Sequence, residues 1–445
     1  MAKQSGSGER KTIAALATGS LPSGIAIVRL SGPQALVLGQ KLCARFPGNS
    51  SELKTTAFID PADGAVIDWG MVCWFRGPKS HTGEDVCEFH LHGSAAVADK
   101  ILEVLTDCGA RLAEAGEFTR RAFENGKMDL TEIEGLADLL AAETEAQRQL
   151  AVRLSSDEMH RKVAAWREAL VRARAFLEAE FDFSDEEDVP DSMVAEVCSG
   201  IASLRNDIAI TLEGYQAGEI IRRGFRVALV GPPNAGKSSL LNALAKRDIA
   251  IVTEVAGTTR DVLEARVDIN GLAVIVFDTA GIRDSEDRIE AIGVERARQT
   301  AEAADLVIWL SPKDEPVLPE KDLGSVSVFQ SKSDLESGGG FEGNVSLGEV
   351  STVAPDGLDG FIGYIEKQAK LATAGEDILI SRRRQKALLE QTAEHLAQFG
   401  DVVAADRVLA AEELRLAGEC LGRLTGRIDP EELLDVIFAE FCVGK

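Results

Sequence analysis

A phosphate-binding loop lies near the middle of this sequence of 445 residues. Residues 231–238 read Gly-Pro-Pro-Asn-Ala-Gly-Lys-Ser and fit the pattern G-x-x-x-x-G-K-[ST] in full. An apolar β-type segment, 226–230, precedes the loop, and residues 239–244 follow it with helical periodicity. A strand, a glycine turn and a helix start direct backbone N–H groups and a helix dipole at one point, which attracts phosphate. We expect Lys237 to reach the β- and γ-phosphates and the Ser238 hydroxyl to ligate Mg²⁺.

Two further segments complete a nucleotide site. Residues 257–261, Gly-Thr-Thr-Arg-Asp, follow at the distance expected for a first switch loop. There Thr259 would place its hydroxyl on Mg²⁺ and its backbone N–H on the γ-phosphate. Residues 273–281 form an apolar strand that ends in Asp-Thr-Ala-Gly. Asp278 would support Mg²⁺ through water, and Gly281 would bind the γ-phosphate and move when that phosphate leaves.

The base-recognition segment departs from the usual pattern. Residues 331–334 read Ser-Lys-Ser-Asp where GTPases carry Asn-Lys-x-Asp. Asp334 can accept from guanine N1–H and its 2-amino group, and Lys332 is present. Ser331 is shorter than asparagine and makes only part of that contact, so we expect guanine preference with weaker affinity. Ser351 stands where a serine normally backs the base, although an ordinary loop serine is an equal alternative.

The residue that orients the attacking water in Ras-like GTPases is missing. Ile282 follows the Asp-Thr-Ala-Gly segment, where those enzymes carry glutamine. An aliphatic side chain cannot position water, so hydrolysis is very slow or another group does so. Asn234 in the phosphate loop and Glu290 beyond the second switch are the polar candidates.

Composition restricts the class of protein. Hydrophobic residues make up 45% and charged residues 27%, which is typical of a globular protein, and the length predicts two or three domains. No apolar run approaches the roughly 20 residues of a membrane span, and the polar N-terminus is not a secretory signal. Seven cysteines without a framework indicate a cytoplasmic protein. A net charge of −25 argues against a general polyanion binder.

The order of predicted elements gives the fold class. Strand-like and helical patterns mix before residue 125, long helical patterns follow, strands and helices alternate from residue 222, and helices return after Gly375. The sequence predicts a P-loop GTPase domain with a mainly parallel sheet, inserted in a discontinuous helical domain and preceded by an α+β domain. The expected domains are 1–125 (N-terminal), 126–221 (first helical part), 222–373 (GTPase) and 374–445 (second helical part).

The chain resembles the MnmE (TrmE) family of tRNA-modifying GTPases over nearly its whole length. The terminal segment 441–445, Phe-Cys-Val-Gly-Lys, is the most particular match, because the GTPase motifs alone indicate only the broad class. The other matching segments are 231–238, 256–261 and 278–283 in the GTPase part, and 81–85, 116–123 and 127–130 before it.

The resemblance implies a potassium-activated GTPase that forms a homodimer through its GTPase domains. Asn234 would hold K⁺, with first-switch groups that include Thr253, Val255 and Thr258 completing the cage, and Glu290 would orient the water. The ion would sit where an arginine finger otherwise supplies positive charge. The implied GTP/GDP, Mg²⁺ and K⁺ contacts come from Asn234, Ala235, Gly236, Lys237, Ser238, Ser239, Thr253, Glu254, Val255, Ala256, Gly257, Thr258, Thr259, Asp278, Thr279, Ala280, Gly281, Lys332, Asp334 and Ser351.

The family also binds a 5-formyl-tetrahydrofolate-type cofactor in the N-terminal domain. The resemblance assigns that site to Arg29, Glu88 and Lys127, with Lys445 nearby. Arg29 and Lys127 suit a carboxylate tail, and Glu88 suits the paired donors of a pterin. Cys442 matches a cysteine important for tRNA modification, although a structural thiol is an equal alternative.

The function implied is hydrolysis of GTP, coupled to adding a carboxymethylaminomethyl or aminomethyl-type group at C5 of the wobble uridine of certain tRNAs. The implied partners are tRNA and a FAD-dependent protein, MnmG, which would form a heterotetramer with this chain; no membrane is involved. One alternative is an Era-like ribosome-assembly GTPase that binds rRNA, but the sequence after residue 374 has no G-x-x-G clamp. Another is a regulatory GTPase switch without modification activity.

Overall fold

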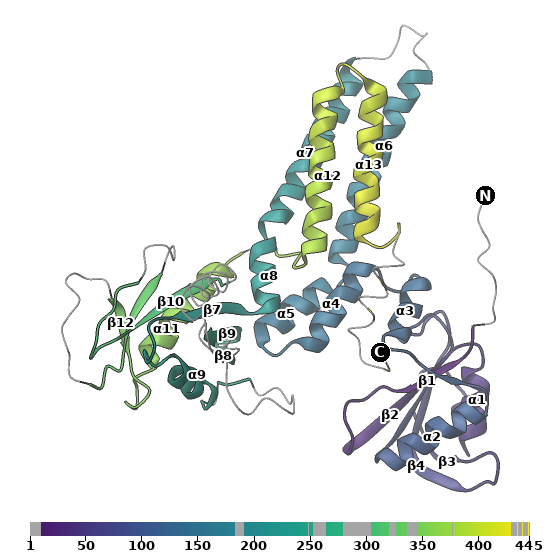
Figure 1. Ribbon diagram of the computed structural model, residues 1–445. Helices are drawn as coiled ribbons and strands as arrows, with labels where there is room; N and C mark the ends of the chain where they lie inside the picture. Colours follow the sequence, from purple (N-terminus) through teal and green to yellow (C-terminus); the bar gives the residue numbers. More distant parts are fainter. Residues whose placement is uncertain are drawn as a thin grey trace, which may run out of the picture. The chain divides into compact units, whose positions relative to one another are not determined.

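The chain divides into two compact units in the computed structural model (Figure 1). One unit comprises residues 1–137 and 422–445, and the other comprises residues 138–421. The residues that the structure describes are 10–182, 191–247, 249–251, 264–278, 304–319, 326–335, 346–375 and 377–428, together with Leu434, Phe438 and Gly444.

The first unit is built on a six-stranded sheet in the order β3-β4-β5-β2-β1-β6. All neighbouring strands are antiparallel except the pair β1–β6, which is parallel. The strands are β1 (Ile13–Leu16), β2 (Ser23–Ser31), β3 (Lys54–Ile59), β4 (Val66–Phe75), β5 (Val86–Gly93) and β6 (Arg111–Leu112). The helices are α1 (Ala35–Leu42), α2 (Ala95–Asp107), α3 (Glu117–Glu124) and the greater part of α4 (Leu130–Ala141).

Different helices cover the two faces of this sheet. Because side chains alternate along a strand, neighbouring residues of one strand point to opposite faces. On β2, Val28 and Leu30 point into a core beneath α1 and α2 that also contains Phe89. Figure 1 shows both helices on that one face. On the opposite face, Phe118 of α3 packs with Ile13 and neighbouring residues at one end of the sheet. The polar residues of β2 and β5 that alternate with the core therefore lie on the face that α3 covers in part.

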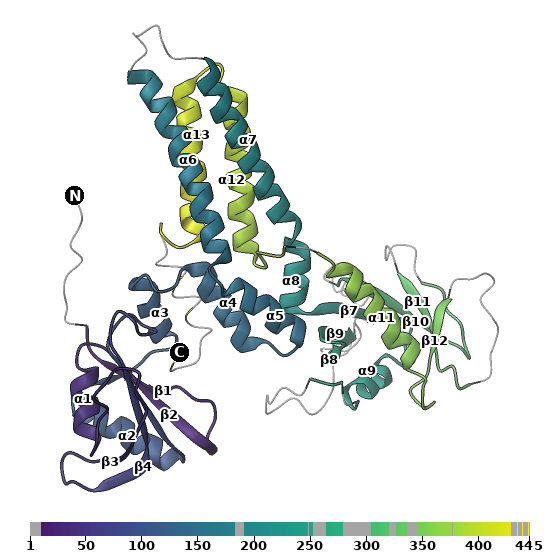
Figure 2. The same ribbon diagram turned by 180° about the vertical axis from the view of Figure 1, so that it is seen from behind.

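The second unit contains long helices that precede and follow a second sheet. Helix α7 packs against both α6 and α12, and His395 of α12 lies 2.7 Å from Glu413 of α13 (Figures 1 and 2). The helical segments before and after the sheet thus pack together. The helices are α5 (Glu145–Leu154), α6 (Glu158–Asp182), α7 (Asp191–Glu213), α8 (Tyr215–Arg223), α12 (Arg383–Val402) and α13 (Arg407–Leu424).

The long helical pattern that follows residue 125 in the sequence is divided in the structure into α4, α5 and α6. At the first break, Gln147 accepts a hydrogen bond from the backbone N–H of Thr144 at 3.1 Å, which satisfies a donor at the start of α5. Periodicity alone did not reveal this break, because apolar residues continue on both sides of it.

The sheet of the second unit has the order β12-β11-β10-β7-β9-β8. Its strands are parallel except for β8, which pairs antiparallel with β9 at the edge. Buried residues from the sheet, α9 and α11 form its core. The elements are β7 (Phe225–Val230), α9 (Lys237–Ala245), β8 (Glu264–Ile269), β9 (Leu272–Asp278), β10 (Leu306–Pro312), β11 (Ser327–Ser331), β12 (Ser346–Val350) and α11 (Asp359–Ala372).

The predicted fold class is confirmed: an α+β N-terminal part, a mainly parallel sheet and helices on both sides of it in the sequence. The domain boundaries at 125/126, 221/222 and 373/374 stay predictions. Among the described residues, no helix is both long enough and apolar enough to cross a membrane.

Candidate functional site

The loop between β7 and α9 follows a path that few residue types permit. A Cβ atom at Gly231 would lie 2.4 Å from the carbonyl oxygen of Leu310 on the neighbouring strand, so the loop can pass there only with glycine. Asn234 has φ +64° and Gly236 has φ +90°, both in the left-handed region that these residue types tolerate. The loop therefore curls around one point at the carboxyl end of β7.

Lys237 is the first residue of α9, and its side chain folds back over the loop. Its Nζ donates to the carbonyl oxygens of Gly231 at 2.9 Å and Pro232 at 3.0 Å. The residue is only 6% exposed. A buried ammonium is stable only with such partners, and phosphate oxygens at the helix start would supply stronger ones.

Ser238 and Asp278 meet at the same edge of the sheet. Strands β7 and β9 are parallel neighbours, so the loop after β7 and the last residue of β9 lie side by side. The Ser238 hydroxyl donates to Oδ2 of Asp278 at 3.0 Å, and Asp278 is 5% exposed. A hydroxyl and a carboxylate together are hard oxygen ligands, so this donor set fits Mg²⁺.

Asp334, which follows β11, and Ser351, which follows β12, form a hydrogen bond with each other. The Ser351 hydroxyl donates to Oδ1 of Asp334 at 2.6 Å, and its oxygen accepts the backbone N–H of Val353 at 3.1 Å. The hydrogen bond from Ser351 lowers the pKa of Asp334. Asp334 is exposed and ionised, so it can accept paired donors from a ligand.

Two residues just before Asp334 differ in burial: the side chain of Lys332 is partly exposed, whereas Ser331 is buried. Lys332 adopts the left-handed region at φ +55°, and its Nζ lies 3.4 Å from Oδ2 of Asp314. Ser331, the last residue of β11, is only 4% exposed. The loop after β7, the Ser238–Asp278 pair at the end of β9 and the Asp334 carboxylate after β11 thus lie along one edge, where parallel α/β sheets place ligand sites.

Several predicted site residues lie outside the described residues, and their predicted roles stay predictions. They belong to the first switch, the second switch and the C-terminal segment. These residues are Thr253, Glu254, Val255, Ala256, Gly257, Thr258, Thr259, Thr279, Ala280, Gly281, Glu290, Cys442 and Lys445.

In the first unit, the structure brings Arg29 and Glu88 together. They face each other across β2 and β5, and both Nε and Nη2 of Arg29 lie 2.9 Å from Oε1 of Glu88. The Arg29 guanidinium also lies 5.7 Å from the ring centre of Phe118, a cation–π contact. Oε2 of Glu88 lies 3.8 Å from Nε2 of His90. One Glu88 oxygen therefore contacts Arg29, and the other faces His90.

His81 lies close to this pair, whereas Lys127 lies beside Gly83. Burial, followed by the positive charge of Arg29, lowers the pKa of His81. The stem of the exposed Lys127 side chain is 3.3 Å from the position that a Cβ atom would take at Gly83. No contact within the described residues joins Lys127 to Arg29 or Glu88.

Arg121 was part of a matching segment without an assigned role, and the structure shows what it does. It is 5% exposed and donates to Oε2 of Glu84 at 2.9 Å and to Oε1 of Glu117 at 3.0 Å. Ser31 donates to the same Glu84 oxygen at 2.8 Å. The segments 81–85 and 116–123 are thereby joined in one buried network. In the sequence these two segments stood out as matches to the family, which gave no sign that they bind each other.

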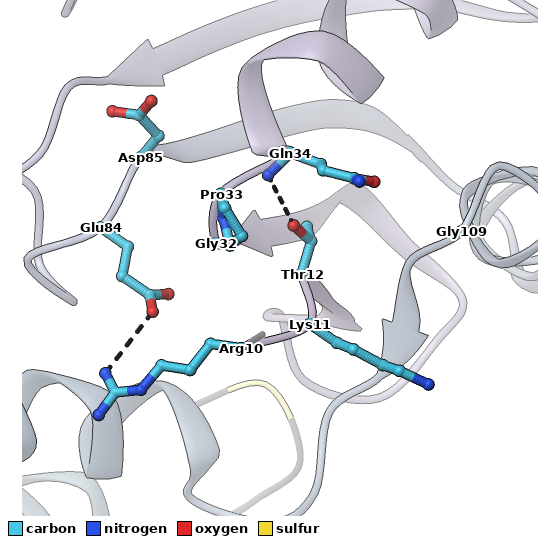
Figure 3. Close-up of a pocket in the computed structure, with 9 residues that line it drawn as sticks. All are labelled: Arg10, Lys11, Thr12, Gly32, Pro33, Gln34, Glu84, Asp85 and Gly109. Carbon is cyan, nitrogen blue, oxygen red and sulfur yellow. Dashed lines mark hydrogen bonds and ion pairs between the residues drawn. The ribbon is translucent and has the colours of Figure 1, made fainter. Parts of the chain in front are cut away.

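A pocket of about 790 Å³ opens beside this network (Figure 3). Thr12 accepts the backbone N–H of Gln34 at 2.9 Å on one side of it. Arg10 lies 3.9 Å from Glu84 on another. Its lining consists of Arg10, Lys11, Thr12, Gly32, Pro33, Gln34, Glu84, Asp85 and Gly109, and so does not include the predicted folate residues.

Comparison with known families accounts for both units. A family profile described as the GTP-binding protein TrmE N-terminus matches residues 12–127. A second profile, described as the MnmE helical domain, matches residues 130–442. The chain belongs to the MnmE (TrmE) family. The resemblance found in the sequence motifs is therefore confirmed.

MnmE-family relatives match along almost the entire chain, and each is named tRNA modification GTPase MnmE. The relative from Rhizobium etli is 46% identical over 441 residues, which cover 98% of this chain and 99% of the relative. The relative from Agrobacterium fabrum is 46% identical over 444 residues, with the same coverage. The relative from Brucella suis is 44% identical over 443 residues, which cover 98% of each chain.

Proposed function

We propose that this chain binds and hydrolyses GTP and that hydrolysis serves the modification of tRNA in the cytoplasm. The observation that carries the proposal is the hydrogen bond between Ser238 and Asp278 at the end of the phosphate loop. It places the Ser238 hydroxyl, the expected Mg²⁺ ligand, beside a carboxylate that would support the ion through water. Asp334, oriented by Ser351, supplies the acceptor that favours guanine. Family membership favours this function over an Era-like assembly factor.

Nucleotide choice gives the direct test. Full-length protein is titrated with fluorescent GDP and ADP analogues in the presence of Mg²⁺, and phosphate release is then measured with GTP and ATP. The proposal expects binding and turnover with guanine nucleotides only. Equal binding of the ADP analogue would refute the role given to Asp334.

We further propose activation by K⁺, with Asn234 as an ion ligand and Glu290 as the group that orients water. Asn234 is exposed on the phosphate loop, and its left-handed backbone directs the loop around the expected β–γ bridge. A cation held there would neutralise charge that develops in the transition state.

The test compares GTP hydrolysis in K⁺ and Na⁺ at equal ionic strength. Wild type should be faster in K⁺, and Asn234→Gly should lose this difference. Glycine is the suitable substitute because it accepts φ +64° without strain. Retained K⁺ stimulation in the glycine variant would contradict the ion-binding role.

For tRNA modification, we propose that this chain acts as a homodimer with a FAD-dependent partner of the MnmG type, in a heterotetramer. The reaction would add an aminomethyl-type group to the wobble uridine, and Cys442 would take part. Support for the role in tRNA modification comes from the relatives named tRNA modification GTPase MnmE, which match 98% of the chain. Mass spectrometry of wobble uridines, in cells lacking this protein and in cells complemented with it, tests the reaction. Unchanged wobble uridines in cells that lack this protein would refute the proposed reaction.

We also propose that Arg29 and Glu88 bind a tetrahydrofolate-type cofactor, with Lys127 and Lys445 as further contacts. The cofactor would supply the one-carbon unit. The residues present fit such a group, because a guanidinium suits a carboxylate and the second Glu88 oxygen suits paired pterin donors. Calorimetric titration with 5-formyl-tetrahydrofolate should give weaker binding for Glu88→Gln than for wild type. Glu103→Gln, an exposed substitution on α2, is the matched control.

A further inference from the structure

The start of α5 meets the turn between β8 and β9. The backbone N–H of Ala146, the second residue of α5, donates to the carbonyl oxygen of Gly271 at 3.0 Å. The first N–H groups of a helix have no partner within the helix, so the sheet supplies an acceptor that α5 lacks. A Cβ atom at Gly271 would lie 3.6 Å from the Cβ atom of Glu145, so the turn and the helix are also in van der Waals contact.

The turn is stiff. It consists of two residues, Asn270 at φ +51° and Gly271 at φ +84°. Left-handed backbone at both positions is what a tight turn between antiparallel strands requires. The N–H of Gly271 also donates to Oδ1 of Asp268 at 2.6 Å. A shift of β8 or β9 therefore displaces Gly271 as well.

Both predicted switches are continuous with this hairpin. Strand β9 ends at Asp278, and the second predicted switch follows it directly in the sequence. Strand β8 begins at Glu264, three residues after the first predicted switch, 257–261. The chain before that switch also pairs with β8, because the N–H of Ile251 donates to the carbonyl oxygen of Arg266 at 2.9 Å. Any movement of the switches with the nucleotide thus acts on β8 and β9.

Helix α5 connects the hairpin with the long helices. Leu154 packs in a cluster with Ala217 of α8 and with Ile378, which lies shortly before α12. At the same end of α5, Nη2 of Arg153 lies 3.1 Å from Oε1 of Glu158 on α6. One end of this ten-residue helix therefore contacts the hairpin, and the other end contacts α6, α8 and the segment before α12.

We propose that the contact between Gly271 and Ala146 opens and closes with the nucleotide and so transmits the nucleotide state to the helices. The proposal rests on the proposed function, because GTP and GDP are the states that it distinguishes. GTP would draw both switches toward its γ-phosphate, shift the strands joined to them and move Gly271 away from α5. With GDP the contact stays closed. A ligand shifts such an equilibrium only through different affinities for the two states, so GTP must bind better when the contact is open.

Ala146→Pro opens the contact, because it removes the donor at a helix position in the first turn, where proline is tolerated. By reciprocity, the variant should bind a non-hydrolysable GTP analogue more tightly relative to GDP, by about twofold to tenfold, the effect of one hydrogen bond. Calorimetric titration of the full-length chain measures both affinities. Deuterium uptake of α5 in wild type should be greater with the GTP analogue than with GDP, and in Ala146→Pro it should be equally high with both.

Glu145→Pro is the matched control. It places proline one residue earlier in the same helix and removes an N–H that forms no hydrogen bond to Gly271 among the described contacts. Its affinity ratio and its nucleotide-dependent uptake should match those of wild type. Nucleotide-dependent uptake that persists in Ala146→Pro would overturn the proposal.

A disulfide provides the opposite perturbation. The spacing of 3.6 Å between the Cβ positions of residues 145 and 271 suits a disulfide, whose Cβ atoms lie about 3.5–4.5 Å apart. The oxidised double variant Glu145→Cys, Gly271→Cys would hold the contact closed. It should bind the GTP analogue about fivefold or more weakly relative to GDP, and dithiothreitol should restore the ratio. Wild type treated with the same oxidant controls for the native cysteines.

The outcomes separate this proposal from the proposed function. If wild type binds neither nucleotide, the proposed function itself fails. If wild type binds both and uptake in α5 is the same with each, only the coupling through α5 fails. Equal affinity ratios in the oxidised and reduced double variant would also overturn the coupling. So would failure of the disulfide to form, because the turn and the helix would then not meet in solution.

Discussion

At the scale of single residues, hydrogen bonds already orient the side chains that a nucleotide would use. Ser238 donates to Asp278, and Ser351 donates to Asp334. In each pair a hydroxyl fixes a carboxylate, so less conformational freedom is lost when a ligand binds. The pairs differ in burial: Asp278 is enclosed, as befits a metal-supporting group, whereas Asp334 is exposed to an incoming base.

Ser238→Ala tests the metal-binding pair. The variant loses the hydroxyl proposed as a direct ligand of Mg²⁺, so the free Mg²⁺ concentration for half-maximal GTP hydrolysis should rise about tenfold or more. Hydrolysis rates are measured over a Mg²⁺ titration at saturating GTP. Ser203→Ala, on the exposed surface of α7, should match wild type. An unchanged Mg²⁺ requirement in Ser238→Ala would exclude the hydroxyl as a ligand.

At the scale of elements, α3 is held to the N-terminal sheet by charge as well as by packing. Phe118 enters the apolar cluster beneath the helix, while Glu117 at its first position binds two arginines. Nη1 of Arg111 donates to Glu117 at 2.7 Å, and the buried Arg121 donates at 3.0 Å. Because Arg121 also holds Glu84, the same network positions the loop that carries His81 near Arg29 and Glu88.

The network makes stability depend on pH through Glu117. Burial alone raises the pKa of Glu117, but hydrogen bonds from Arg111, the Glu114 backbone N–H and Arg121 outweigh burial and lower it. A carboxyl with a lowered pKa in the folded state contributes fully above its unfolded pKa, about 4.3, and loses that contribution as pH falls through the folded pKa. Wild type should therefore lose stability on acidification below about pH 4.3.

Glu117→Gln should lower the free energy of unfolding at pH 7 by about 1–3 kcal/mol and show a shallower decline between pH 5 and pH 3. Urea unfolding of the N-terminal unit, followed by tryptophan fluorescence at several pH values, provides the measurement. Glu103→Gln, whose carboxylate is 61% exposed, serves as the control. Parallel pH profiles for wild type and Glu117→Gln would show that this carboxyl does not carry the effect.

At the scale of the whole molecule, the chain passes from one group of helices into the mainly parallel sheet and then returns to the same helices. Arg222 near the end of α8 donates to the carbonyl oxygen of Ser381, just before α12, at 3.3 Å. A Cβ atom at Gly218 would lie 2.4 Å from the carbonyl oxygen of Ile380, so α8 and this segment touch closely. The points where the chain leaves and re-enters the helices are therefore adjacent.

This adjacency predicts that the helices fold without the sheet. A chain in which residues 225–372 are replaced by a short Gly/Ser linker should keep the far-ultraviolet circular dichroism of the remaining helices and unfold cooperatively. It should bind no GDP analogue, because the phosphate loop and the base-binding carboxylate are absent. A linker variant with no helical signal would indicate that the helices depend on the sheet for folding.

The amino-acid sequence alone determined the phosphate loop, the fold class and the family. These features are local or repetitive: a strand, a glycine turn and a helix start occupy contiguous residues, and hydrophobic periodicity marks long helices. The sequence also predicted site roles for Asp278 and Asp334, because each lies at or just after the end of an apolar strand in a known order. It could not determine the break before α5, where the backbone N–H of Thr144 donates to the side chain of Gln147 at the start of the new helix.

Only the tertiary structure decided which distant side chains meet. Arg29 and Glu88 are separated by 59 residues, and the antiparallel register of β2 and β5 places them opposite each other. Ser238 meets Asp278 because β7 and β9 are parallel neighbours, a pairing that local sequence does not encode. The unpartnered hydroxyl of Ser331 is likewise a tertiary property, because burial and the absence of a partner within the described structure both depend on neighbouring strands.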